Sequence, residues 1–158
     1  MCWSSRYCPI KRGAQNLIIV YKVVTYINSS ECRALYKGFK YVYKRVYRDP
    51  GSLEIRKRNN MYRWEIYRGF HSYATMDRAL QEYEEAITYH LGKVALVECM
   101  IPIGSIYYKN VDDEIVSNGI FINRILKTNA KLPCAWTIIY LFIIILLSCF
   151  ILFKVFIS

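Results

Sequence analysis

The feature that most constrains this chain is a run of 22 residues, 132–153, that contains no charged side chain. A helix rises about 1.5 Å per residue, so roughly 20 such residues cross the hydrocarbon core of a bilayer. Lys131 precedes the run and Lys154 follows it. A buried core helix is the alternative, but such helices are usually shorter and carry some polar residues. We therefore predict one C-terminal transmembrane helix, residues 132–157, after a head domain of residues 1–131.

The charges around this run predict its orientation in the membrane. Arg124, Lys127 and Lys131 precede the run, whereas Lys154 alone follows it. Basic residues favour the cytoplasmic side of a membrane. The apolar residues 17–20 form a run too short for the hydrophobic region of a signal peptide. We expect a single-pass, tail-anchored membrane protein whose head lies in the cytosol. Its expected partner is the lipid bilayer.

The head is basic, and its positive charge is uneven. The formal net charge of the chain is +10, and Arg33–Arg68 holds eleven Lys or Arg residues against three acids. Such a stripe beside a membrane anchor suggests contact with anionic lipid headgroups, although a solvated sheet face would look the same. The predicted anionic-surface residues are Lys40, Lys44, Arg45, Arg56, Lys57, Arg58 and Lys131.

Aromatic residues interleave with these cations between residues 36 and 68, a pattern also typical of nucleic-acid binding. In alternating strands, however, the aromatics and the cations fall mostly on opposite faces. This argues for a basic face over an aromatic core. Nucleic acid is therefore the less favoured partner, and a host protein is a further possible one.

The cysteines do not indicate a metal site. No Cys-x-x-Cys pair occurs, and neither His71 nor His90 has zinc-ligand spacing to a cysteine pair. We predict reduced thiols, no metal and no cofactor. The six cysteines are Cys2, Cys8, Cys32, Cys99, Cys134 and Cys149.

The first half of the head reads as β-strands. Residues 17–27 are β-branched and aromatic, and residues 39–47 alternate between aromatic and basic side chains. Turn residues occupy 28–30 and 49–52, and a further strand pair flanks Asn59–Asn60. We predict an antiparallel meander with one wet, basic face.

The second half changes period. Apolar residues at helical spacing predict a helix over 75–91, with Thr75 as a possible N-cap. A central strand follows at 94–101, and closing strands are expected at 105–108 and 115–126. The predicted fold is α+β, with an antiparallel or mixed sheet and one main helix.

Two motifs in this half are similar to those of a known group of proteins. They are Gly-Phe-His-Ser-Tyr at 69–73 and Ile-Pro-Ile-Gly-Ser-Ile-Tyr-Tyr at 101–108, followed by Val-Ser-Asn at 116–118. Residues 66–124 thereby resemble uncharacterised small proteins of phages and large DNA viruses. The resemblance implies a viral or phage origin, and it implies no activity.

An enzymatic function has little support in the sequence. The weak catalytic candidates are His71, Tyr73 and Glu98, with Ser72 and Glu114 as possible partners. The order of these residues along the chain weakly resembles that in ADP-ribosyl-transferring folds, but the paired glutamates typical of those enzymes are absent. Neighbouring His and Ser side chains seldom face each other as a nucleophile pair requires. A non-enzymatic interaction module at an anionic membrane surface is the favoured hypothesis.

Overall fold

A computed structural model describes most of the head. Within the described residues, no helix is both long and apolar enough to cross a membrane. The predicted transmembrane segment 132–157 and Lys131 lie outside the described residues. The described ranges are 3–5, 10–35, 38–51, 53–57, 64–66, 68–89 and 92–130.

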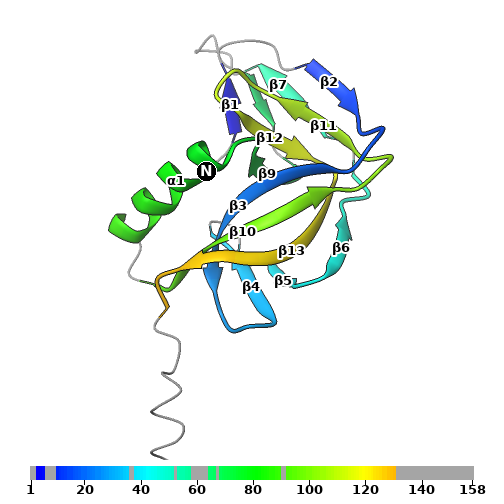
Figure 1. The fold of residues 1–158 in the computed structure, drawn as a ribbon. Helices are drawn as coiled ribbons and strands as arrows, with labels where there is room; N and C mark the ends of the chain where they lie inside the picture. Colours follow the sequence, from blue (N-terminus) through cyan, green and yellow to red (C-terminus); the bar gives the residue numbers. More distant parts are fainter. Residues whose placement is uncertain are drawn as a thin grey trace, which may run out of the picture.

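The described residues form two antiparallel sheets and one helix, α1 (Met76–Tyr89) (Figure 1). This confirms the predicted α+β class. The small sheet has the order β1-β8-β7, and the large one β2-β11-β12-β9-β3-β10-β13-β6, with β4 paired to β3 and β5 to β4. The strands of the small sheet are β1 (Trp3–Ser5), β7 (Ile55–Lys57) and β8 (Trp64–Ile66). Those of the large sheet are β2 (Ile10–Gly13), β3 (Ile18–Tyr26), β4 (Glu31–Ala34), β5 (Lys40–Val42), β6 (Arg45–Arg48), β9 (Phe70–Tyr73), β10 (Val94–Ile101), β11 (Ile106–Lys109), β12 (Glu114–Ser117) and β13 (Gly119–Thr128).

Strand β10 is central, as its nearly continuous apolar sequence predicts. It pairs with β3 on one side, from Val94 opposite Thr25 to Ile101 opposite Ile18, and with β13 on the other. Because neighbouring residues of a strand point to opposite faces, β10 presents alternate side chains to two separate cores. The predicted strands 17–27 and 94–101 are confirmed.

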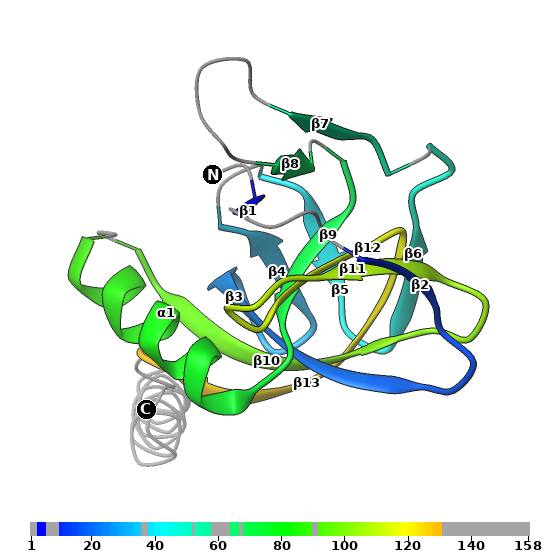
Figure 2. The same cartoon turned by 90° about the horizontal axis from the view of Figure 1, so that it is seen from above.

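The inner face of these strands surrounds the main core. Residues of β3, β10 and β13 pack there with Tyr41 of β5 and Phe70 of β9. Figure 2 shows α1 on one side of β10 and β13, with β4 and β5 on the other. The core residues at these positions include Val20, Val24, Val97, Cys99, Ile101, Ile120 and Ile122.

Helix α1 covers part of the outer face. Ala79, Tyr83 and Ala86 are buried against Val23 and Leu96 of the sheet. The helix starts one residue after the predicted cap and confirms the predicted element, since its buried positions recur at helical spacing. Ile87 is 38% exposed, whereas the polar Glu82 is only 6% exposed.

The predicted meander is confirmed for β3, β4 and β5, which pair antiparallel in chain order, but it is wrong beyond β5. The chain does not continue as one strand over 39–47, because Lys44 adopts a positive φ of 59° and its N–H donates to Ile122 O at 2.7 Å. As a result, β5 pairs with β4, while β6 pairs with β13. The pair β7–β8 belongs to the small sheet. The pair itself was predicted, and Arg56 and Lys57 are exposed as expected, whereas Glu65, expected on the wet face, is only 7% exposed.

The closing segment is divided at Asn118, where a single strand was predicted. The Asn118 side-chain oxygen accepts the N–H of Ile106, and its own N–H donates to Ile106 O, so this residue joins the start of β11 to the break. The chain turns before β11, with a hydrogen bond from Ser105 N to Pro102 O. A second turn, at residues 110–113, joins β11 to β12, and Asn110 Oδ1 accepts two backbone N–H groups there.

Gly69 allows the chain to enter β9. Its φ is +101°, and an added Cβ would lie 2.6 Å from Leu53 Cδ2 and 2.8 Å from Ser117 O. Both the backbone conformation and the close packing therefore require glycine.

Candidate functional site

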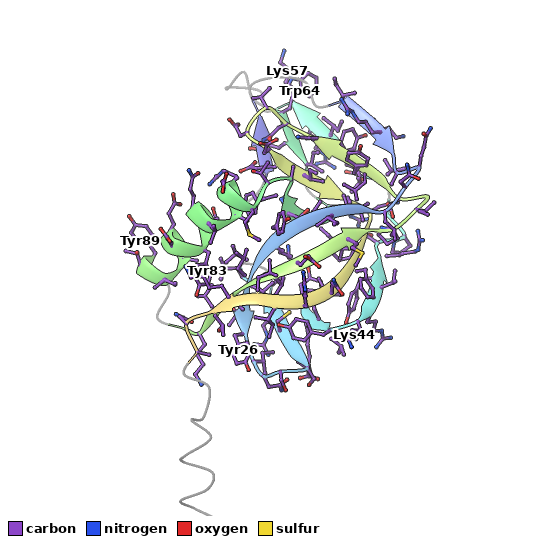
Figure 3. The ribbon with its side chains drawn as sticks, viewed as in Figure 1. Tyr26, Lys44, Lys57, Trp64, Tyr83 and Tyr89 are labelled. Carbon is purple, nitrogen blue, oxygen red and sulfur yellow. The ribbon has the colours of Figure 1, made fainter. Side chains whose placement is uncertain are left out.

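The structure divides the predicted anionic-surface residues between the two sheets. Lys40, Lys44 and Arg45 lie on or beside β5 and β6, whereas Arg56 and Lys57 lie on β7. Figure 3 shows Lys57 at the top of the molecule, beside Trp64, and Lys44 far from it near the lower right edge. Arg58 also lies outside the described residues, like Lys131. The described cations thus form two separate groups.

These cations also differ in their neighbours. Lys40 Nζ lies 2.8 Å from Glu31, and Arg56 lies 2.8 Å from Glu54, so both charges are partly neutralised. The guanidinium of Arg45 lies 5.9 Å from the ring centre of Tyr47. Across the described ranges, neither Lys44 nor Arg45 has an ion-pair partner.

Strand β13 determines which cations lie near Ala130, the last described residue of the head. At its end, Val94 N donates to Asn129 Oδ1 at 2.6 Å, and Asn129 N donates to Val94 O. Val94 is in register with Thr25, Thr25 with Arg33, and Arg33 with Lys40. This end of the sheet, here called the basal end, carries the cations Arg33, Lys40, Lys93 and Lys127.

Sequence reasoning included Lys40 but missed the other three basal cations as a group. They come from β4, from the residue before β10, and from β13, so only the strand register brings them together. Arg33 and Lys93 are exposed, and neither has an ion-pair partner in the described part of the chain. Lys127 lies 3.9 Å from Glu84 of α1.

A second cluster surrounds Tyr73 at the start of α1. Arg78 lies 5.3 Å from the Tyr73 ring centre and 3.7 Å from the Glu114 carboxylate. The Tyr73 hydroxyl is hydrogen-bonded to Glu82. Burial, followed by the charges of Glu82 and Glu114, raises the pKa of Tyr73, and burial raises the pKa of Glu114. This arrangement joins α1 to β9 and β12.

The remaining catalytic candidates are not brought together with this cluster. Glu98 accepts hydrogen bonds from Asn123 at 2.5 Å and from Arg124 at 3.0 Å. The hydrogen bond from Arg124 is the main reason that the pKa of Glu98 is lowered. This carboxylate therefore ties β10 to β13. Sequence reasoning named Tyr73 and Glu114 but missed Arg78 and Glu82, whose i,i+4 spacing at a helix start was the available signal.

His71 and Ser72 do not form a nucleophile pair. They are consecutive residues of β9, so their side chains point to opposite faces. The Ser72 hydroxyl lies 3.5 Å from Ile115 O, to which it donates, and His71 O accepts a hydrogen bond from Lys22 Nζ. The Ser72 side chain therefore ties β9 to β12, whereas the contact of His71 with Lys22 uses only its backbone carbonyl.

The two thiols of the main core and the ring of Tyr41 are buried. Burial raises the pKa of Cys32 to about 11 and also raises the pKa of Cys99, so both remain protonated thiols at neutral pH. Tyr41 is buried against Phe70 and Tyr47, which leaves its ring no free face for stacking a base. No group of three or more His, Cys, Asp or Glu side chains in the described ranges is placed to hold a metal ion.

Comparison of the chain with protein-family models, with curated proteins and with solved structures gives no match. The similarity of residues 66–124 to small viral proteins therefore stays a prediction based on the two motifs. Conclusions about function depend on the geometry described above.

Proposed function

We propose that this protein is held in a membrane by residues 132–157 and that the basal end of its head binds anionic lipid headgroups beside that anchor. The observation that carries the proposal is the position of the chain at Ala130. There β13 has just ended among Lys93, Lys127 and the row that contains Arg33, and the uncharged run begins two residues later. The head is a non-enzymatic interaction module.

This geometry favours some of the predicted surface cations over others. Polybasic segments gain about 1 kcal/mol per charge near an anionic bilayer, and the effect fades beyond a Debye length of roughly 10 Å. Cations beside the anchor therefore contribute most. Arg56 and Lys57 are on the small sheet, away from the basal end, and they serve as an internal control (Figure 3).

Membrane insertion and orientation are tested first. Asn28 lies in an exposed turn and begins an Asn-Ser-Ser acceptor sequence for N-glycosylation. We would express the full chain in eukaryotic cells with a second acceptor site after Ser158. Modification only at the added site supports a membrane anchor with a cytosolic head. Modification at Asn28 would place the head in the lumen and contradict the proposed orientation.

Lipid binding is tested by flotation of residues 1–131 with vesicles. This fragment contains every described strand and helix, and near-UV circular dichroism checks that it is folded. We expect the fragment to prefer anionic over neutral vesicles. The double variant Arg33→Ala/Lys93→Ala should weaken partitioning about thirtyfold, which corresponds to the loss of about two charges near the surface.

The matched control is Arg56→Ala/Lys57→Ala, which removes the same charge from the small sheet. It should retain most of the binding. Equal binding of the fragment to neutral and anionic vesicles would refute the proposal. A greater loss from the control pair than from the basal pair would show that the other end of the head contacts lipid.

A further inference from the structure

The outer face of β3, β10 and β13 consists of successive cross-strand rows. Val23, Leu96 and Lys127 form a row beneath α1. The next row toward the other end of β10 is polar, with Glu98 bonded to Arg124 of β13. Figure 1 shows α1 lying over only one end of these strands, while the part nearest β6 carries no helix among the described residues. The face is thus half covered.

The row beyond Glu98 is apolar on all four strands. Ile19 of β3 is in register with Met100 of β10, Met100 with Phe121 of β13, and Phe121 with Val46 of β6. Ile19 is 54% exposed and Val46 is 48% exposed, while Met100 and Phe121 are partly exposed. We call this row, Ile19, Met100, Phe121 and Val46, the β6 patch. A contiguous apolar row of this kind on a solvent-exposed face marks an interaction surface.

Cations border the β6 patch at one side. Lys44 and Arg48 lie two residues before and two residues after Val46, and both are exposed. Neither has an ion-pair partner within the ranges that the structure describes. The patch therefore combines an apolar centre with an unneutralised positive rim, and it is complementary to an apolar segment that carries carboxylates.

Helix α1 shows what such a segment looks like on the covered half. Its apolar positions face Val23 and Leu96, while its Glu84 reaches Lys127 of β13 at 3.9 Å. An amphipathic helix with acidic flanks would repeat this arrangement on the β6 patch, with its carboxylates near Lys44 and Arg48. Helices that cover a sheet commonly lie side by side in one layer.

Two other occupants fit less well. Phe121 lies seven residues before Thr128 on β13, a separation of roughly 23 Å along the strand, so the patch is about two Debye lengths from the basal end. A bilayer at the basal end is therefore a poor occupant, an argument that rests on the proposed function. A second copy of this chain would bring its own Lys44 and Arg48 to the same surface, which is unfavourable.

We propose that the β6 patch docks an acidic amphipathic helix of a partner protein. The test uses the full chain in nanodiscs of neutral lipid and two synthetic probes of about 18 residues, long enough to form a helix. Both probes carry leucine on one helical face. One has glutamate on the other face, and the other has lysine. Fluorescence anisotropy of labelled probes measures the dissociation constant.

The glutamate probe is expected to bind and the lysine probe to bind at least tenfold more weakly. Ile19→Asp/Val46→Asp should weaken the glutamate probe by at least tenfold, because both side chains lose apolar contact and add repulsion. The matched control Ile10→Asp/Val111→Asp places the same charges at somewhat more exposed apolar residues elsewhere and should leave binding unchanged. Unaltered melting temperatures identify variants that fold normally.

A charge swap makes the test independent of apolar contacts. Lys44→Glu/Arg48→Glu should invert the preference toward the lysine probe, whereas Lys11→Glu/Arg12→Glu on β2 should not. Equal binding of both probes, no binding of either, or full binding by the Ile19/Val46 variant would overturn the proposal. Because the nanodiscs are neutral, the result does not depend on whether the basal end binds anionic lipid.

A bilayer as the true occupant is tested in nanodiscs that contain phosphatidylserine. If the patch faces the bilayer, the anionic lipid should abolish binding of the glutamate probe, and Ile19→Asp/Val46→Asp should reduce flotation of residues 1–131. That pair of results would overturn the docking of a protein helix. Retained probe binding and unchanged flotation support it.

Discussion

The two halves of the outer face of β10 have the same strand geometry but different surroundings. Leu96 lies under α1 and is 1% exposed, whereas Met100, four residues later on the same face, remains partly exposed beside Ile19 and Phe121. Alternation along the strand cannot distinguish these positions, since it only assigns each residue to a face. Burial at Leu96 is supplied by a helix from elsewhere in the chain. An apolar residue on a strand therefore indicates a face that needs a cover, and it does not show that the cover belongs to the same chain.

The boundary between the halves is polar. Glu98 and Arg124 form a cross-strand pair at 3.0 Å, and Asn123 adds a second donor to the same carboxylate. A polar row in the middle of an apolar face separates two contact regions and limits how far a helix can slide along the strands. The following predictions test whether the two halves are energetically distinct.

The largest difference is expected between Leu96→Ala and Met100→Ala. Leu96→Ala removes a fully buried side chain and leaves a cavity under α1, which costs about 2–5 kcal/mol of unfolding free energy. Met100 has partial solvent contact, so the same truncation should cost about 1 kcal/mol or less. Chemical unfolding of the full chain in detergent, followed by near-UV circular dichroism, measures both. Equal losses of unfolding free energy would mean that the half of the face around Met100 is also covered in the native protein.

The elements of this fold were predictable to the extent that their signals are local. The strand at 17–27 and the helix that starts near Thr75 are evident because β-branched runs and helical spacing depend on neighbours in sequence. The partners of β5 and β6 were not predictable, because pairing with β4 and β13 depends on the path of the whole chain. Nothing about a lysine indicates the positive φ at Lys44 that separates these two strands.

The next largest effect is expected for α1, the helix that covers the Leu96 half of the outer face. Tyr73→Phe removes the hydroxyl bonded to Glu82, a residue of α1 that is almost fully buried. A buried carboxylate that loses a donor costs about 1–2 kcal/mol. Hydrogen exchange should show faster opening of α1 with little change in the β6 patch. Tyr107→Phe on β11 is the control, and equal changes in α1 in both variants would contradict a specific role for Tyr73.

A smaller effect is expected at the polar boundary. Glu98→Gln weakens the contact with Arg124, whose side chain is largely exposed, so the loss at neutral pH should be about 1 kcal/mol or less. The folded pKa of Glu98 lies below its usual value of 4.5. Its stabilising contribution is therefore present above pH 4.5 and is lost as the pH falls through the folded pKa. The difference between wild type and variant should shrink in that acidic range.

The pH dependence of stability expected from Glu114 has the opposite sign to that from Glu98. Burial raises its folded pKa above 4.5, so the wild type loses stability from this group as the pH rises from 4.5 through the folded pKa. Over this range, the unfolding free energy of Glu114→Gln should increase relative to that of the wild type as the pH rises. Parallel pH profiles for the Glu98 and Glu114 variants would contradict the assigned directions.

The functional residues were harder to predict than the fold, for a related reason. Lys40, Arg56 and Lys57 are close in sequence and were grouped on that basis. The structure instead aligns Lys40 with Arg33 through β4–β5 pairing and places the other two on a different sheet. Glu114 was one of two possible carboxylate partners for the segment that contains Tyr73, and the two residues do meet, because β9 and β12 are paired there. Candidates on paired strands meet, and no sequence pattern shows which strands will pair.

The smallest effect is expected at Ile19. Its side chain is more than half exposed, so Ile19→Thr should change the unfolding free energy by about 0.5 kcal/mol or less, as for most surface substitutions. Val23→Thr is the matched substitution four residues later on the same face, and there the hydroxyl would be buried under α1 at a cost of about 1–3 kcal/mol. Parallel unfolding curves measure the contrast. If Ile19→Thr were as harmful as Val23→Thr, the β6 patch would be part of the core, and its apolar character would need no partner to explain it.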